Sequence, residues 1–299
     1  MPLLPSDSVK QVAIVGGTHG NEWTGIYLVK KFEQFPHLIQ RSTVNSLPLL
    51  ANPRAILMNR RYIDRDLNRC FAAEDLTNPD LTGYENQRAK AISTQLLSEQ
   101  SPPIDLIIDL HSTTANMGLS ILVSGEHPFN LKLSAYLSQM YPAVRVCRGI
   151  QWGEVSPTLR SLVPLGFAIE VGAIAQGMLD AALFQQTEQL IYTILDYLEA
   201  WNQNARPTIP EQLTLFQAIT AVDYPRDATG ELQAMIHPDL QFQDYQPLRL
   251  GDPMFLTFSG ETITYNGSAT VFPIFINEAA YYEKGIAMIL TEKQQIPID

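Results

Sequence analysis

The 299-residue chain contains only two cysteines, Cys70 and Cys147. Two are too few for a disulfide framework or a four-cysteine zinc site, and both are predicted to be small packed hydrophobic residues. A run of 18 or more uncharged apolar residues, as a membrane helix needs, is also missing. The nearest approach, residues 166–184, is interrupted by Glu170 and Asp180. The first ten residues lack the basic region and apolar run of a secretory signal. We therefore expect a soluble, cytoplasmic protein.

Positive charge is scarce as well. The chain has 20 Lys and Arg against 31 Asp and Glu, a net charge of −11 at pH 7. A protein of this charge repels phosphate backbones and anionic lipid surfaces, so nucleic acid and membranes are not expected partners. Hydrophobic residues make up 45% of the chain, enough for a substantial core, which excludes global disorder.

The first two thirds of the chain alternate short apolar runs with longer segments of helical periodicity, a pattern typical of a sheet covered by helices. Strands are predicted at residues 11–17, 47–52, 54–59, 105–111, 119–125, 143–149 and 166–172. Helices are predicted at residues 22–35, 84–97, 131–140 and 179–201. The fold class is therefore α/β.

The sequence changes in character after the last of these helices. Residues 205–210 carry two prolines and no apolar periodicity, which is typical of a linker. Turn signals then separate short alternating segments, as in a β-rich unit. We predict two domains: residues 1–205 as an α/β domain with a mixed sheet flanked by helices, and residues 206–299 as a smaller β-rich domain.

Two histidines and one carboxylate are placed where a ligand site is expected. His19 and Glu22 lie in GGTHGNE, between a predicted buried strand and a helix, and His111 ends the predicted strand DLIIDLH. Ligands of open α/β sheets gather beyond the carboxyl ends of the strands. Two imidazoles and one carboxylate form a common ligand set for catalytic zinc. The alternative, hydrogen-bonded histidines at strand ends, remains open from the residues alone. The other histidines are predicted at the surface: His37, His127 and His237.

An arginine cluster stands out in this acidic chain. Five arginines fall within sixteen residues: Arg54, Arg60, Arg61, Arg65 and Arg69. Asp64 and Asp66 lie among them, so part of the cluster is expected to form internal ion pairs. Because arginine binds carboxylate and phosphate through two parallel hydrogen bonds, the cluster also indicates a small anionic substrate.

Glu170 is the third candidate, in the apolar sequence AIEVG of a predicted core strand. A carboxylate buried without a partner is costly, so Glu170 either pairs with an arginine or lines a site as a base with a raised pKa. By residue type alone, Arg160 in SPTLRS is expected to be solvated, and Tyr281 in NEAAYYEK is expected to pack between the domains.

Nine sequence motifs together resemble the aspartoacylase family, which also includes the succinylglutamate desuccinylases. They run in consistent order from about residue 10 to residue 285: GGTHGNEWTG, NPRAI, RRYIDRDLNR, DLHSTT, IEVG, VDYPRD, HPDLQ, GDPMFLT and NEAAYYEK. The resemblance implies a zinc amidohydrolase with a carboxypeptidase-like α/β domain and a β-rich C-terminal domain that caps the site. Family members commonly self-associate, so a homo-oligomer is compatible with it.

The resemblance also implies residue roles. Zn²⁺ would bind to His19, Glu22 and His111, and Glu170 would act as the general base. Arg61 would bind the substrate and polarise its scissile carbonyl. The remaining residues would bind the substrate: Asn68, Arg69, Arg160 and Tyr281. One departure is Ser156, which stands where the family has a tyrosine, so substrate affinity or side-chain preference is expected to differ.

The implied reaction is hydrolysis of N-acetyl-L-aspartate to L-aspartate and acetate, with an N-acyl amino acid of negative charge as substrate. Alternatives in the same class are an acylase for N-acyl aromatic amino acids, a succinylglutamate desuccinylase and a carboxypeptidase. Arg160 disfavours the aromatic acylase, because an arginine facing an apolar side chain would be unpaired. Ser156 keeps that alternative open. A non-enzymatic anion-binding module is the alternative from another class.

Overall fold

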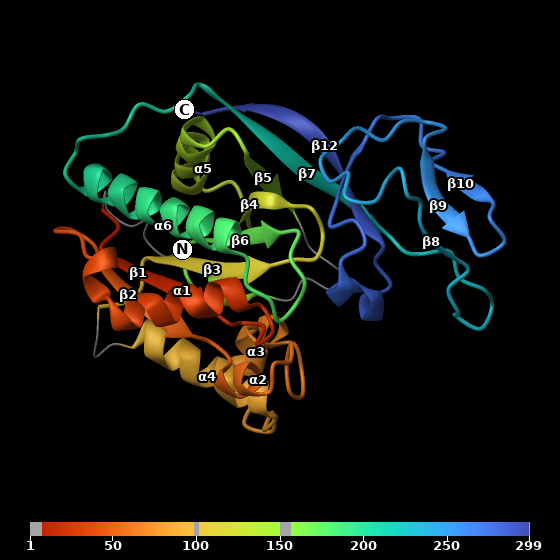
Figure 1. The fold of residues 1–299 in the computed structure, drawn as a ribbon. Helices are drawn as coiled ribbons and strands as arrows, with labels where there is room; N and C mark the ends of the chain where they lie inside the picture. Colours follow the sequence, from red (N-terminus) through yellow and green to blue (C-terminus); the bar gives the residue numbers. More distant parts are fainter. Residues whose placement is uncertain (1–7, 99–101, 150–156, 299) are drawn as a thin grey trace.

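The computed structural model describes residues 8–98, 102–149 and 157–298, as drawn in Figure 1. Its centre is a nine-stranded mixed sheet in the order β11-β12-β7-β5-β4-β6-β3-β1-β2. Five neighbouring strands make up one end of this sheet: β2 (Asn45–Leu50), β1 (Gln11–Gly16), β3 (Leu106–Ser112), β6 (Leu165–Gly172) and β4 (Gly118–Val123). Strands β2, β1, β3 and β6 run parallel, whereas β4 is antiparallel to β6. The predicted α/β class is confirmed.

Helices cover both faces of this sheet. One face carries α1 (Trp23–Gln34), α5 (Pro128–Met140) and α6 (Ala181–Asn202), which share a buried apolar cluster with the strands. The other face carries α4 (Tyr84–Leu97), which packs through Ala89, Ile92 and Leu96. Strand β5 (Val144–Arg148) lies beside β4. These elements agree with the predicted helices and strands to within three residues at each end, with one exception.

The exception is residues 54–59, which we predicted as a strand. They lie instead in and after the short helix α2 (Pro53–Leu57). The side-chain oxygen of Asn52 accepts a hydrogen bond from the backbone N–H of Ala55, and Pro53 occupies the first helical turn, so both residues favour a helix start. Two more short helical segments follow, η2 (Leu67–Arg69) and α3 (Ala73–Thr77).

The last third of the chain does not form an isolated unit. Strand β7 (Gln212–Val222) pairs in parallel with β5, and β12 (Met288–Pro297) and β11 (Phe272–Ile274) extend the same sheet beyond it. A separate antiparallel sheet contains β8 (Ala234–Ile236), β9 (Pro253–Thr257) and β10 (Thr262–Thr264). In Figure 1 this β-rich part lies to the right of the helices. Among the described helices, none combines the length and apolarity needed to cross a bilayer.

Two further 3-10 segments place side chains of the candidate site. They are η3 (Leu159–Leu162), directly before β6, and η4 (Ala279–Lys284), between β11 and β12. A fourth 3-10 segment, η1 (Pro36–Ile39), follows α1. Both cysteines are buried, as predicted.

Candidate active site

The candidate site lies at the carboxyl ends of three neighbouring parallel strands. His19 and Glu22 belong to the loop between β1 and α1. His111 is the penultimate residue of β3, and Glu170 lies on β6 in register with His111. The loop approaches α2 so closely that a Cβ on Gly20 would lie 2.2 Å from the carbonyl carbon of Ala55. Glycine at position 20 is therefore required for the turn that presents His19.

The ligand atoms of His19, Glu22 and His111 converge on one point, all within 4.8 Å of one another. The Nδ1 atom of His19 lies 2.7 Å from Glu22 Oε1, and the Nδ1 atom of His111 lies 2.9 Å from Glu22 Oε2. The two Nδ1 atoms are 3.2 Å apart. All three side chains are buried. Two imidazole nitrogens and a carboxylate directed at one point are a donor set that fits zinc.

Two aspartates bind the opposite nitrogens of the same rings. His19 Nε2 lies 3.0 Å from Asp66 Oδ1, and His111 Nε2 lies 2.9 Å from Asp109 Oδ2. A carboxylate on the second nitrogen of a ligating histidine fixes the tautomer and ring orientation, and it makes the first nitrogen more basic. Both imidazoles are therefore oriented to bind a cation through Nδ1.

Electrostatics at this point favour a cation. Burial acts to raise the pKa of Glu22, but the positive charges of His19 and His111 outweigh it and lower that pKa. Burial acts to lower the pKa of His111, but the carboxylates of Asp109 and Glu22 raise it well above its usual value. The three carboxylates Glu22, Asp66 and Asp109 thus surround two imidazoles in a position where positive charge is stabilised.

Among the described residues, no arginine forms an ion pair with Glu170. Its Oε2 atom is buried, and the carboxylate forms no hydrogen bond or ion pair with any described residue. Burial is the main cause that raises the pKa of Glu170 to about 8, although the charge of His111 acts in the opposite direction. Of the two interpretations left open by the sequence, the geometry favours a site carboxylate over a structural ion pair.

Arg61 lies beside the same group. Its Nη1 donates to Glu22 Oε1 at 3.1 Å, and its Nη2 lies 3.5 Å from Asp66 Oδ2. Its buried Nε has no partner among the described residues. Burial would lower the pKa of this guanidinium, but Asp66 and Glu22 raise it.

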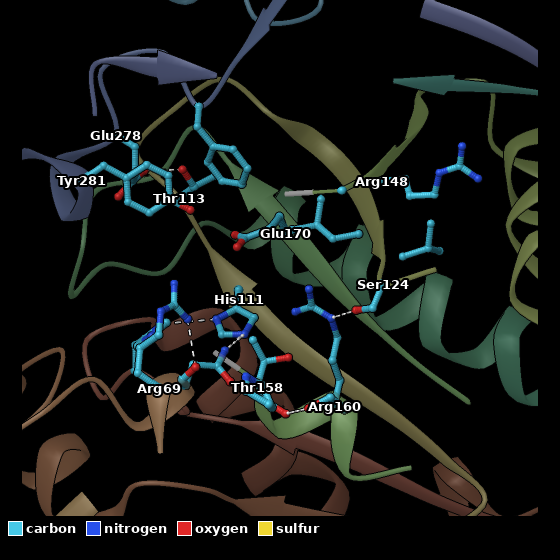
Figure 2. A pocket seen from close by; sticks show the side chains of 18 of the residues that line it. Arg69, His111, Thr113, Ser124, Arg148, Thr158, Arg160, Glu170, Glu278 and Tyr281 are labelled. Atoms are coloured by element: carbon cyan, nitrogen blue, oxygen red, sulfur yellow. Dashed lines mark hydrogen bonds between the residues drawn. The ribbon is translucent and has the colours of Figure 1, made fainter. Parts of the chain in front are cut away.

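A cavity of about 500 Å³ opens onto His19, Glu22 and His111, the candidate metal-ligand group, and Figure 2 shows this cavity from close by. The predicted site residues all line it: His19, Glu22, Arg61, Asn68, Arg69, His111, Arg160, Glu170 and Tyr281. In Figure 2, Arg69 and Arg160 flank His111, and Glu170 lies between them and Tyr281. The fold thus brings all of the predicted site residues, which lie far apart in the sequence, to one cavity. Their individual roles remain predictions.

The cationic side chains are held by their neighbours. Arg160 Nε donates to Ser124 Oγ at 2.8 Å, and burial lowers the pKa of this guanidinium. Arg69 Nη1 donates to the carbonyl oxygen of Asn68 at 2.9 Å. Asn68 Oδ1 accepts from the backbone N–H of Leu159 at 2.9 Å, so its amide links η2 to η3 as well as lining the cavity. Residue 160 was expected to be solvated by residue type, but it is half-buried in the cavity wall.

The C-terminal part of the chain completes the cavity through η4. Glu278 caps this segment and accepts hydrogen bonds from Thr114, at 2.7 Å from its N–H and 2.9 Å from its hydroxyl. It also contacts the hydroxyl of Thr113. At the other end of η4, Lys284 Nζ lies 3.2 Å from Asp66 Oδ2. The buried Tyr281 is therefore held over the cavity by contacts at both ends of its segment.

Sequence reasoning missed four of these polar residues: Asp66, Asp109, Glu278 and Lys284. Asp109 carried a signal, since a charged residue in the apolar strand DLIIDLH is as unusual as Glu170 in its strand. Ser156, where the family pattern is broken, lies outside the described residues. Arg60 is exposed and does not line the cavity.

Two family descriptions match nearly the whole chain. Residues 8–198 match the succinylglutamate desuccinylase/aspartoacylase catalytic domain, and residues 211–293 match the AstE/AspA barrel-sandwich hybrid domain. A probable aspartoacylase of Nostoc is 58% identical over 97% of this chain and 98% of its own length.

Relatives whose names give different substrates match nearly as much of the chain. The aspartoacylase of Danio rerio is 42% identical over 94% of this chain and 91% of its own. The human N-acyl-aromatic-L-amino acid amidohydrolase is 40% identical over 97% of this chain and 92% of its own. The crystal structure of murine aminoacylase 3 superposes with a TM-score of 0.90 at 38% identity, covering 97% of both chains. This chain therefore belongs to the succinylglutamate desuccinylase/aspartoacylase family of hydrolases.

Proposed function

We propose that the protein hydrolyses the amide bond of N-acyl-L-aspartate, with N-acetyl-L-aspartate as substrate and Zn²⁺ as its metal. The observation that carries this proposal is the Glu170 carboxylate, which has no partner among the described residues, is in register with His111 and lines the same cavity as Arg61, Arg69 and Arg160. Family membership supports amide hydrolysis, and the arginines support a substrate with more than one carboxylate.

Each side chain has a task in this reaction. His19, Glu22 and His111 would hold Zn²⁺, which would supply Lewis-acid chemistry: polarising a carbonyl and lowering the pKa of a water molecule to about 7. Glu170 accepts a proton from the attacking water and donates it to the nitrogen of the leaving amine. Glu170 would be ionised when hydrolysis begins, because positive charge held by His19, Glu22 and His111 would lower its pKa.

Arg61 stabilises the negative charge that develops on the carbonyl oxygen. Its guanidinium is held by Glu22 and Asp66, and its Nε has no partner among the described residues. Donors fixed in advance in a water-poor site stabilise such charge more than mobile ones, by roughly 3–4 kcal/mol for a well-placed donor.

Arg69 and Arg160 bind the two carboxylates of the aspartyl group, assisted by Asn68 and Tyr281. We propose further that residues 206–299 form a domain that restricts the cavity to small substrates, through the η4 segment and Tyr281. The reaction needs no partner beyond this substrate.

N-acyl aromatic amino acids are the second candidate substrates. The identity to the human and murine amidohydrolases favours them, and a cavity of about 500 Å³ has space for an aromatic ring. Against them, an aromatic side chain beside Arg160 leaves the guanidinium without a carboxylate.

Release of aspartate from N-acetyl-L-aspartate tests the proposal. The zinc-loaded protein is compared with a chelated sample and with N-acetyl-L-phenylalanine as substrate. Zinc-dependent release of aspartate, with little phenylalanine released, is the expected result. Preference for the aromatic substrate would contradict the assigned role of Arg160, and equal activity after chelation would contradict the role of the metal.

A further inference from the structure

The segment that carries Arg61 and Asp66 has no regular secondary structure. It runs from the end of α2 to the start of η2, and both residues project from it toward the metal-ligand group. Arg61 contacts Glu22, and Asp66 contacts His19, so a shift of this segment displaces partners of two metal ligands together. A segment without a helical or sheet ladder needs other hydrogen-bond acceptors for its backbone N–H groups.

Those acceptors are the oxygens of Glu85, in the first turn of α4. Ile63 N–H donates to Oε1 at 2.7 Å, and the N–H groups of Asp64 and Arg65 donate to Oε2 at 2.9 and 3.3 Å. A fourth hydrogen bond comes from Asn52 Nδ2, 3.1 Å from Oε1. Glu85 is completely buried, and no arginine, lysine or histidine of the described residues forms an ion pair with it.

A second contact runs in the opposite direction. Asp64 Oδ2 accepts a hydrogen bond from the N–H of Tyr84, the first residue of α4, at 2.8 Å. Each of the two segments thus offers a carboxylate to backbone N–H groups of the other. Helix α4 is fixed to the sheet by its buried residues Ala89, Ile92 and Leu96, so it is a rigid support for the segment.

We propose that Glu85 is a positioning residue of the active site, which fixes the segment of residues 61–66 so that Arg61 and Asp66 reach the metal-ligand group. The inference builds on the proposed metal-dependent hydrolysis. A carboxylate is required because both oxygens accept, and hydrogen bonds to an ionised group are the stronger ones. Glutamine has nearly the same shape but presents an NH₂ group to one set of N–H donors, so it fits the space and fails as an acceptor.

The test compares Glu85→Gln with Asp75→Asn. Asp75 also contacts this segment, but only through an exposed ion pair with the side chain of Arg65 at 3.1 Å. The described backbone N–H groups of the segment donate no hydrogen bond to Asp75. Three quantities are measured on zinc-loaded protein: amide hydrogen exchange of residues 61–66, retention of zinc against a chelator, and kcat and KM for N-acetyl-L-aspartate.

For Glu85→Gln we expect faster exchange of the amides of Ile63, Asp64 and Arg65. Zinc affinity should fall about tenfold or more, because Asp66 orients His19. A small displacement of Arg61 should lower kcat by up to about 100-fold with KM changed far less, since this arginine acts on charge that develops during the reaction. Asp75→Asn should leave all three quantities close to those of the wild type.

Unchanged zinc affinity together with unchanged kcat in Glu85→Gln would overturn the proposal, whatever the amide exchange shows. A loss of activity without faster exchange of residues 63–65 would overturn it as well. If the wild-type protein hydrolyses no N-acyl amino acid, the proposed function fails, but zinc retention and exchange still decide the role of Glu85. If Glu85→Gln does not fold, Asp64→Ala removes the reciprocal hydrogen bond from the N–H of Tyr84, because alanine has no side-chain acceptor. It should produce the same three changes to a smaller extent, and wild-type values in all three would overturn the proposal.

Discussion

His111 and Glu170 are directly opposite each other on the neighbouring parallel strands β3 and β6. Residues in register on adjacent strands point to the same face and lie about 4.8 Å apart along the hydrogen-bonding direction. The pairing of these strands therefore sets a carboxylate that has no partner among the described residues beside the imidazole of a proposed metal ligand. Neither side chain needs a loop to reach the other, so their relative position is as rigid as the sheet.

Replacing Glu170 with glutamine should abolish turnover without loss of zinc. The amide has nearly the same shape but accepts no proton, and a positioned acid–base group contributes about 10²- to 10⁴-fold to the rate. The measurement is kcat alongside zinc content per chain. The exposed Glu33 on α1 provides a control, Glu33→Gln, which should behave as wild type. Turnover of Glu170→Gln within a few-fold of wild type would refute the role of this carboxylate.

Asp109→Asn should weaken zinc binding. Asp109 accepts from Thr18 Oγ1 at 2.7 Å and orients His111 through Nε2, and loss of such a carboxylate typically costs about 10- to 100-fold in metal affinity. Competition with a chromophoric chelator measures the change. Asp239→Asn is the matched control, because Asp239 also lies beside a histidine, His237, but on the surface. Equal affinity in Asp109→Asn and wild type would argue against zinc at this site.

Arg160→Leu should change substrate preference. Loss of one charge-assisted contact to a substrate carboxylate costs about 1.5–3 kcal/mol, so kcat/KM for N-acetyl-L-aspartate should fall about 10- to 100-fold. The value for N-acetyl-L-phenylalanine should stay level or rise. Ser124→Ala is the control, since it removes only the hydrogen bond that holds Arg160 Nε. A parallel fall for both substrates would show that Arg160 does not discriminate between them.

The sequence predicted the sheet and helices well because their apolar patterns are strong and regular. It failed at residues 54–59, where the apolar run AILM suggested a strand and the capping by Asn52 and Pro53 determined a helix. The continuation of the main sheet into β7 also escaped it. That junction rests on two residue pairs, Cys147 with Phe216 and Arg148 with Gln217, and pairing between distant strands leaves no local signal.

The residues of the candidate site were likewise predicted only in part. Residues in long motifs, such as His19 and Glu22, were identified because the motifs are specific. Asp66 and Glu85 were missed because their partners lie 47 and about 20 residues away in the chain, so only the fold brings them together. A carboxylate within an arginine-rich segment or a helix start is an ordinary feature of a sequence. What makes these two unusual is burial, which the fold alone determines.

Asp244 lies outside the active site, and its carboxylate should make the free energy of unfolding depend on pH. Its carboxylate is buried and accepts from the N–H groups of Asn116 and Ile276, each at 3.1 Å. Burial outweighs these hydrogen bonds and raises its pKa from 3.8 to about 6. The folded state therefore holds a proton that the unfolded state has lost between these pH values. The stability that this proton provides is complete below about pH 4 and disappears as the pH rises through 6.

The difference in pKa corresponds to about 3 kcal/mol in the free energy of unfolding. Urea unfolding at several pH values between 4 and 7, for wild type and Asp244→Asn, isolates this contribution, since the other carboxylates are common to both proteins. The stability of the wild type relative to the variant should decrease by about this amount as the pH rises across that range. A difference that stays constant from pH 4 to 7 would show that Asp244 is ionised in the folded protein throughout.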